Sequence, residues 1–185
     1  EPGAFVGANV EVGSGTWIGS GAVIYGPTRI GEKNQIWPKA VLGGAPQDLG
    51  YAGQPTRLEV GDRNTFREGV TIHRASTKGE GVTRVGNDNF FMAFSHVGHD
   101  CVVEDKVIMA NGVLVAGHCW IQSFANLSGA TAVAQFVTIG KYAFTCGTSG
   151  VRRDLEPFIS FDKNECGEAK ATCINEVGLR RWGVP

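Results

Sequence analysis

The chain has 185 residues, a formal net charge of −1, 42% hydrophobic residues and 27 glycines. A charge this close to zero argues against binding nucleic acid or an anionic membrane surface, and glycine without a Gly-X-Y period excludes collagen. No apolar run approaches the roughly 20 residues of a membrane-spanning helix, and five scattered cysteines without a C-x-x-C pair favour a reducing cytoplasm over a zinc knuckle or thioredoxin-like site.

The first part of the chain repeats an aliphatic residue every six positions. A period of six fits neither the 3.6-residue period of an amphipathic helix nor the two-residue alternation of a two-faced strand. It is typical of a parallel β-helix, and glycine often follows the aliphatic residue, where we expect it to permit the backbone conformation of a tight corner. The repeated residues are Val6, Val12, Ile18, Ile24, Ile30, Ile36 and Leu42.

Two interruptions break the repeat, at residues 43–58 and 74–84. Between them the series returns at Val60, Phe66 and Ile72. Both interruptions are expected to be loops that leave the coil. After the second one the series continues without a slip through Val85, Phe91, Val97, Val103, Met109, Val115, Ile121, Leu127, Val133, Ile139, Thr145 and Val151.

The repeat predicts an all-β protein, a left-handed parallel β-helix over residues 1–155, with the hand taken from hexapeptide-repeat proteins in general. Three hexapeptides form one triangular coil, so residues 18 apart stack at about 4.8 Å. The aliphatic residue points to the axis, and a small residue four positions later fills a second inner position. Residues 156–185 are expected to form a short, mixed and partly helical C-terminal tail.

Cys101 and Cys119 fall 18 residues apart in that second inner position. Their Cα atoms could therefore approach the roughly 4.4–6.8 Å of a disulfide. In a reducing compartment we interpret them as packed thiols.

The same stacking gathers polar residues at one corner of the coil. His99 is expected to lie one coil below Gly117 and two below Gln135, and His118 directly follows Gly117. If Ile72 stacks under Val97, His73 reaches the same corner from the coil below. A single surface histidine is more often only a polar residue. For His96 this interpretation and a functional one are equally acceptable. For His99 the cluster and the adjacent Asp100 favour a catalytic role.

A histidine with a pKa of about 6.5 accepts a hydroxyl proton at neutral pH. Acyl transfer also requires a donor to the tetrahedral oxyanion, for which the backbone N–H of Gly117 is a candidate. The imidazole needs a partner that fixes its tautomer. Asp100 could be that partner, and a backbone carbonyl is an equally acceptable alternative.

Several motifs follow one another from about Gly43 to Arg181, and together they resemble a known family. They are Gln47-Asp48-Leu49, Thr71-Ile72-His73-Arg74, His96-Val97-Gly98-His99-Asp100-Cys101, Ala116-Gly117-His118 and Gly178-Leu179-Arg180-Arg181. This ordered set is similar to the UDP-N-acetylglucosamine O-acyltransferases, which begin lipid A synthesis. The resemblance implies a homotrimer without cofactor or metal that transfers a (hydroxy)acyl chain from acyl carrier protein to the 3-hydroxyl of a UDP-sugar.

The resemblance also implies roles for individual residues. His99 corresponds to the family's base and Gly117 to its oxyanion donor. Positions that line the sugar and phosphates are Asp48, His73, His96, His118 and Gln135, and positions that hold the nucleotide are Asn175 and Arg181. The residues at positions that measure the acyl chain are Met92, Phe144 and Gly147, of which bulky Phe144 is expected to shorten the chain accepted.

The sequence departs from the family pattern on the nucleotide side. Gly50 replaces a lysine, Ala134 a histidine and Trp182 an arginine, and Val177 stands where an acidic residue is expected. The family's helical C-terminal domain does not follow Pro185, so residues 156–185 are expected to begin a truncated or missing domain.

Three other functions are compatible with the repeat. Val70-Thr71-Ile72-His73 also resembles the γ-carbonic anhydrases, zinc enzymes of this fold, although His96 and His99 are three apart where that family spaces its later pair by five. The remaining alternatives are a coenzyme A-dependent acetyltransferase and a non-catalytic hexapeptide scaffold.

Overall fold

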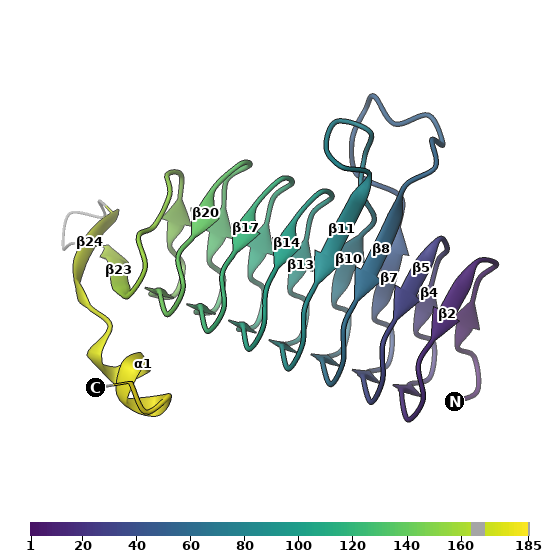
Figure 1. Ribbon diagram of the computed structural model, residues 1–185, viewed down its shortest axis with the longest axis horizontal. Helices are drawn as coiled ribbons and strands as arrows, with labels where there is room; N and C mark the ends of the chain where they lie inside the picture. Colours follow the sequence, from purple (N-terminus) through teal and green to yellow (C-terminus); the bar gives the residue numbers. More distant parts are fainter. Residues whose placement is uncertain (164–168, 185) are drawn as a thin grey trace.

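The computed structural model describes residues 1–163 and 169–184, which form a solenoid of short strands with both termini at opposite ends (Figure 1). Three parallel sheets make its sides. Sheet A consists of β1 (Phe5–Val6), β4 (Val23–Ile24), β7 (Val41–Gly44), β10 (Thr71–His73), β13 (His96–Val97), β16 (Leu114–Val115), β19 (Ala132–Val133) and β22 (Gly150–Val151).

The other two sheets continue each coil. Sheet B consists of β2 (Val10–Val12), β5 (Thr28–Ile30), β8 (Arg57–Val60), β11 (Val82–Val85), β14 (Val102–Val103), β17 (Trp120–Ile121) and β20 (Thr138–Ile139). Sheet C consists of β3 (Trp17–Ile18), β6 (Gln35–Ile36), β9 (Thr65–Phe66), β12 (Phe90–Phe91), β15 (Ile108–Met109), β18 (Asn126–Leu127), β21 (Phe144–Thr145), β23 (Ile159–Lys163) and β24 (Ala169–Ile174).

The strand register follows the 18-residue stacking. Val97 pairs with Val115, and Val115 with Val133. Across the second loop Ile72 pairs with Val97, as the stacking argument required. The predicted left-handed parallel β-helix is confirmed.

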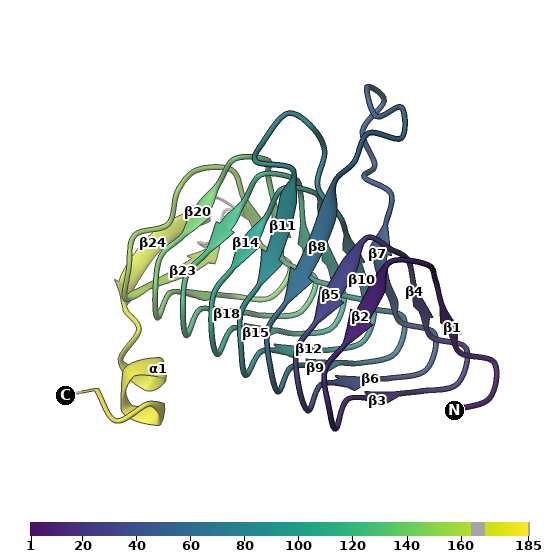
Figure 2. The ribbon, with the colours of Figure 1, turned by 45° about the vertical axis from the view of Figure 1, so that its right-hand side comes forward.

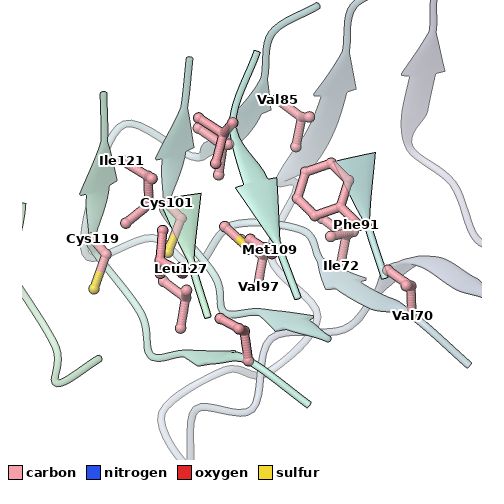
Figure 3. Close-up of a cluster of buried hydrophobic side chains, with 14 of the residues drawn as sticks. Val70, Ile72, Val85, Phe91, Val97, Cys101, Met109, Cys119, Ile121 and Leu127 are labelled. Carbon is pink, nitrogen blue, oxygen red and sulfur yellow. The ribbon is translucent and has the colours of Figure 1, made fainter. Parts of the chain in front are cut away.

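The core is the column of aliphatic side chains on the solenoid axis. Figure 3 shows Ile72, Val97, Met109 and Leu127 among the buried side chains of this column. Val6 and Val12, in the same repeat position, are 46% and 39% exposed because β1 and β2 are the last strands of their sheets and have no coil below them.

The second inner position is filled as predicted by small side chains. Cys101 and Cys119 are buried, free thiols (Figure 3). Each donates to a backbone carbonyl on the coil above, Cys101 to Ala116 at 3.1 Å and Cys119 to Ala134 at 3.0 Å. The interpretation as packed thiols is confirmed.

Most glycines that follow an aliphatic residue have a different role from the one predicted. The left-handed backbone conformation occurs two residues further along, for example at Asp100 (φ 61°) and His118 (φ 62°). The glycine instead permits close stacking of backbones, because a Cβ on Gly98 would lie 2.7 Å from the Gly117 nitrogen. The expectation that this glycine shapes the corner was therefore wrong for Gly7, Gly13, Gly19 and Gly31, whereas Gly43, where the chain enters the first loop, has a φ of 73°.

Residues 45–56 and 74–81 lie outside the strands and project from the same edge of the solenoid (Figures 1 and 2). The two loops contact each other, since Lys78 Nζ lies 2.8 Å from Asp48 Oδ1. Arg74 ties them to the coil by donating to the Gly43 carbonyl at 2.9 Å and to the Tyr51 hydroxyl at 3.1 Å.

Stacking continues beyond residue 155, where the sequence placed the end of the helix. β23 pairs in parallel with β21, and β24 pairs with β23 in the antiparallel direction. A single short helix, α1 (Glu176–Arg181), follows in the described chain, and Trp182 packs edge-on against Phe124 at 5.0 Å. Among the described residues no helix has the length and apolarity needed to cross a bilayer.

We expect Leu127→Ala to lower the free energy of unfolding by about 2–5 kcal/mol, because it opens a cavity in a fully buried part of the axis. Leu49→Ala is the matched control, since Leu49 is fully exposed on the first loop, and we expect a change of at most about 0.5 kcal/mol. Denaturant unfolding at one protein concentration measures both. Equal losses in the two variants would contradict the stacked core.

Candidate active site

His99 lies at the corner between sheets A and B, where the chain leaves β13. Its side chain is only 9% exposed, and its Nδ1 lies 2.8 Å from Oδ2 of the next residue, Asp100. Adjacent side chains usually diverge, but Asp100 adopts the left-handed conformation, with a φ of 61°. The carboxylate, and not a backbone carbonyl, is thus the partner of the His99 imidazole.

The contact fixes the tautomer of His99. An ionised carboxylate only accepts hydrogen bonds, so the proton of a neutral His99 imidazole must lie on Nδ1. Nε2 then carries a free lone pair. This is the arrangement that a general base requires.

Gly117 stacks directly on the His99 ring, as predicted. A Cβ at position 117 would lie 2.9 Å from Nε2 and 2.8 Å from Cε1 of His99. Within the described chain the Gly117 amide donates no hydrogen bond to a backbone carbonyl. The corner therefore places the His99 imidazole against a glycine backbone whose amide has no carbonyl partner in the described chain.

His118 contacts both members of the His99–Asp100 pair. Its Nε2 lies 3.8 Å from Asp100 Oδ2, and its ring meets that of His99 edge-on with centroids 5.1 Å apart. Phe136, one coil above, stacks on His118 at 4.6 Å with the rings nearly parallel. The predicted neighbourhood of His118 and His99 is present, although His118 is not among the residues that line the adjoining groove.

A groove of about 630 Å³ opens beside His99 and runs over the outer face of sheet A. We call it the first groove; among its lining residues are His73, His96, His99, Gly117, Gln135 and the exposed Phe94. Five of the residues predicted from sequence thus share one cavity, which combines imidazole groups with an apolar wall.

His73 and His96 line the first groove as a neutral pair. Burial, followed by the neighbouring charges of His96, His99 and Arg74, lowers the pKa of His73 to about 4. Burial and the charge of His99 also lower the pKa of His96. The two rings meet edge-on at 5.1 Å, so His99 has two imidazole neighbours that are uncharged at neutral pH.

Asp48 lies on the first loop, where the Lys78 ammonium and the Gly50 N–H hold the pKa of its carboxyl below the usual value. A side chain on Gly50 would come within 3.5 Å of Lys78 Nζ. The ammonium group of Lys78, on the second loop, therefore lies close to position 50, where the family has a lysine and this chain has Gly50.

Other predicted residues lie elsewhere. A second groove of about 410 Å³, on the outer face of sheet C, is lined by Phe144, Asn175 and Arg181, among others. Asn175 is buried and caps α1, because its Oδ1 accepts from Gly178 N at 3.0 Å while its Nδ2 donates to the Tyr142 carbonyl. Met92 and Gly147 follow strands of sheet C and line neither groove.

Within the part of the chain that the structure describes, one group of side chains could hold a metal ion, and it belongs to the candidate site. His99, Asp100 and His118 each offer a ligand atom, and these atoms lie within 4.8 Å of one another. Asp100 Oδ2, which faces both imidazoles, already accepts two hydrogen bonds from Ser76. The donor set therefore suits a base and its orienting acid at least as well as a metal.

Two residues that contact the site were missed in the sequence, one against His96 and one against Asp100. Thr71 Oγ1 lies 2.8 Å from His96 Nδ1, and the register that pairs Thr71 with His96 could have revealed it. Ser76 contacts Asp100 from the second loop. Because the loop has no repeat register, spacing offered no signal for Ser76.

The fold and its corner site define a hexapeptide-repeat transferase, and residues 9–44 and 83–117 match the family model described as bacterial transferase hexapeptide (six repeats). The UDP-N-acetylglucosamine acyltransferase of Francisella novicida is 34% identical, with 100% of this chain and 69% of that chain covered at a TM-score of 0.87. The UDP-N-acetylglucosamine acyltransferase of Bacteroides fragilis is 32% identical, with 100% of this chain and 78% of that chain covered at a TM-score of 0.90. The enzyme of Moraxella catarrhalis is 35% identical, with the same coverage of both chains and a TM-score of 0.87. The chain belongs to the UDP-N-acetylglucosamine acyltransferase family.

We expect His73 to titrate near pH 4 and His96 below the ordinary 6.5, as measured by NMR of histidine-labelled protein. The unfolded chain binds a proton at His73 near pH 6.5, whereas the folded chain resists protonation until about pH 4. Acidification through this window therefore destabilises the fold. His73→Gln should reduce the drop in Tm between pH 7 and pH 5; a His73 midpoint near 6.5 would contradict the buried, neutral assignment.

Proposed function

We propose that this chain transfers an acyl group from acyl carrier protein to the 3-hydroxyl of UDP-N-acetylglucosamine, the first step of lipid A synthesis. The observation that carries the proposal is the 2.8 Å contact of His99 Nδ1 with Asp100 beside the Gly117 backbone. Membership of the acyltransferase family supports the substrate class.

In the proposed reaction His99 Nε2 takes the proton of the sugar hydroxyl as the oxygen attacks the thioester carbonyl. The resulting oxyanion accepts a hydrogen bond from the Gly117 N–H. Collapse of the tetrahedral intermediate breaks the carbon–sulfur bond, and the imidazolium returns its proton to the leaving thiolate. Asp100 stabilises the imidazolium between the two proton transfers.

The remaining polar residues of the first groove suit binding of the sugar and its phosphates. His73, His96 and Gln135 line the groove from the coils of β10, β13 and β19. A neutral imidazole both donates and accepts a hydrogen bond. With their lowered pKa values, His73 and His96 would not compete with His99 for the proton of the sugar hydroxyl. Asp48, which is paired with Lys78, directly follows Gln47, a lining residue of the groove.

We further propose a homotrimer that works in the cytoplasm. Phe144, Asn175 and Arg181 lie in the second groove, on another face of the same chain. A neighbouring subunit that brings its sheet C to the first groove would unite the predicted nucleotide and acyl residues with His99. Met92 and Gly147, near sheet C, would then measure the acyl chain from the neighbouring subunit.

His99→Ala should lower kcat by about 10²–10⁴-fold, the loss typical of a missing general base. The substituted side chain lies at a corner outside the aliphatic column, so the oligomer should persist. Steady-state turnover with an acyl carrier protein donor and size-exclusion chromatography measure the two quantities. Unchanged turnover would eliminate His99 as the base.

Gly117→Ala should lower kcat by at least about 10-fold although it keeps the backbone N–H, because the new methyl group would collide with the imidazole at 2.8–2.9 Å. Gly150→Ala is the matched control. Gly150 lies in β22 of the same sheet, and a Cβ there meets nothing within 4 Å. The kcat of this variant should therefore stay within about 2-fold of the parent. Similar losses in both variants would remove the special position of Gly117.

The substrate class is tested by mass spectrometry of products from a panel of donors and acceptors. We expect O-acylated UDP-N-acetylglucosamine from acyl carrier protein donors, with a preference for shorter chains imposed by Phe144. Product formed only from acetyl-coenzyme A would favour an acetyltransferase. Zinc that copurifies in stoichiometric amount, together with bicarbonate dehydration, would favour the carbonic anhydrase alternative.

A further inference from the structure

The carboxylate of Asp100 is held by a loop as well as by His99. Its side chain is 3% exposed, and all of its described hydrogen bonds converge on Oδ2. Ser76 supplies two of the three donors, its backbone N–H at 2.9 Å and its hydroxyl at 2.6 Å. A hydrogen bond as short as the second is typical of a hydroxyl that donates to an ionised oxygen.

The other sides of Asp100 are also fixed. Its backbone N–H donates to Thr83 Oγ1 at 2.8 Å, which holds the corner in place. Gly79 lies against the free oxygen, since a Cβ there would stand 2.8 Å from Oδ1. The carboxylate therefore has little room to rotate, and Oδ2 remains directed at the His99 Nδ1.

Ser76 itself is built into the loop. The residue is 2% exposed, and its hydroxyl oxygen accepts from the Lys78 N–H at 3.1 Å. The hydroxyl thus has a fixed acceptor role towards the loop and a fixed donor role towards Asp100. Residues 74–81, an interruption in the repeat, bring to the corner a group that the coil alone does not supply.

We propose that Ser76 is a positioning residue for acyl transfer: it fixes the Asp100 carboxylate so that His99 keeps its proton on Nδ1 and its lone pair on Nε2. The inference rests on the proposed function, because it assigns Ser76 an effect only through the Asp100–His99 pair. Ser76 contacts neither substrate in this scheme.

A double-mutant cycle tests the inference on the full-length protein with acyl carrier protein donor and UDP-N-acetylglucosamine. Ser76→Ala should lower kcat by about 10-fold and leave KM within about 2-fold, because a base displaced by a fraction of an ångström loses turnover more than binding. In an Asp100→Ala background the same change should alter kcat by less than about 2-fold, because no carboxylate remains to be positioned. Thr77→Ala, which removes an exposed hydroxyl from the same loop, is the matched control and should match the parent.

The outcomes separate the two proposals. Equal losses from Ser76→Ala in both backgrounds, or no loss in the parent, would overturn the role of Ser76. Undiminished turnover in Asp100→Ala alone would instead overturn the proposed acid–base pair. Gly79→Ala gives an independent check, since its methyl group should disturb the carboxylate from the other side and lower kcat in the parent only.

Discussion

The backbone ladder between neighbouring coils is the constraint on which the rest of the structure depends. In the uninterrupted coils each strand pairs in parallel with the strand 18 residues later, and the parallel pairing continues across the two loops, as between Ile72 and Val97, so corner positions lie directly above the same position of the coil below. Side chains from successive coils become neighbours through pairing between adjacent coils alone. Gly117 lies against His99 and Phe136 against His118 for this reason.

The ladder alone does not make a reactive centre. The outward surface of a regular coil is repetitive, and the site arises where the second loop interrupts it. Ser76 turns the Asp100 carboxylate, the left-handed conformation of Asp100 aims it at His99, and the close stacking of Gly98 and Gly117 leaves room for the imidazole.

The parts of the molecule governed by the repeat could be predicted from sequence, and the rest could not. The pairing of Ile72 with Val97, the buried thiols of Cys101 and Cys119, and the gathering of His73, His99 and Gln135 all follow from the six-residue period. The role of the glycine after the aliphatic residue was misjudged, because composition does not distinguish a need for positive φ from a need for close backbone contact. Ser76 and the cap made by Asn175 depend on loop and tail geometry that has no period. Phe144, Asn175 and Arg181 lie on a second face, and the repeat within one chain carries no information about the subunit contacts of the proposed trimer that would bring them to His99.

The neutral state of His73 and His96 has a consequence for the energy of the proposed intermediate. When His99 becomes an imidazolium, neither of these rings opposes it with a like charge, and the nearest ionised group is the carboxylate that already faces Nδ1. The positive charge on His99 thus meets no like charge from these two rings and is balanced by the carboxylate at the same corner of the coil. His73 and His96 can in this way line the groove while His99 alone transfers the proton.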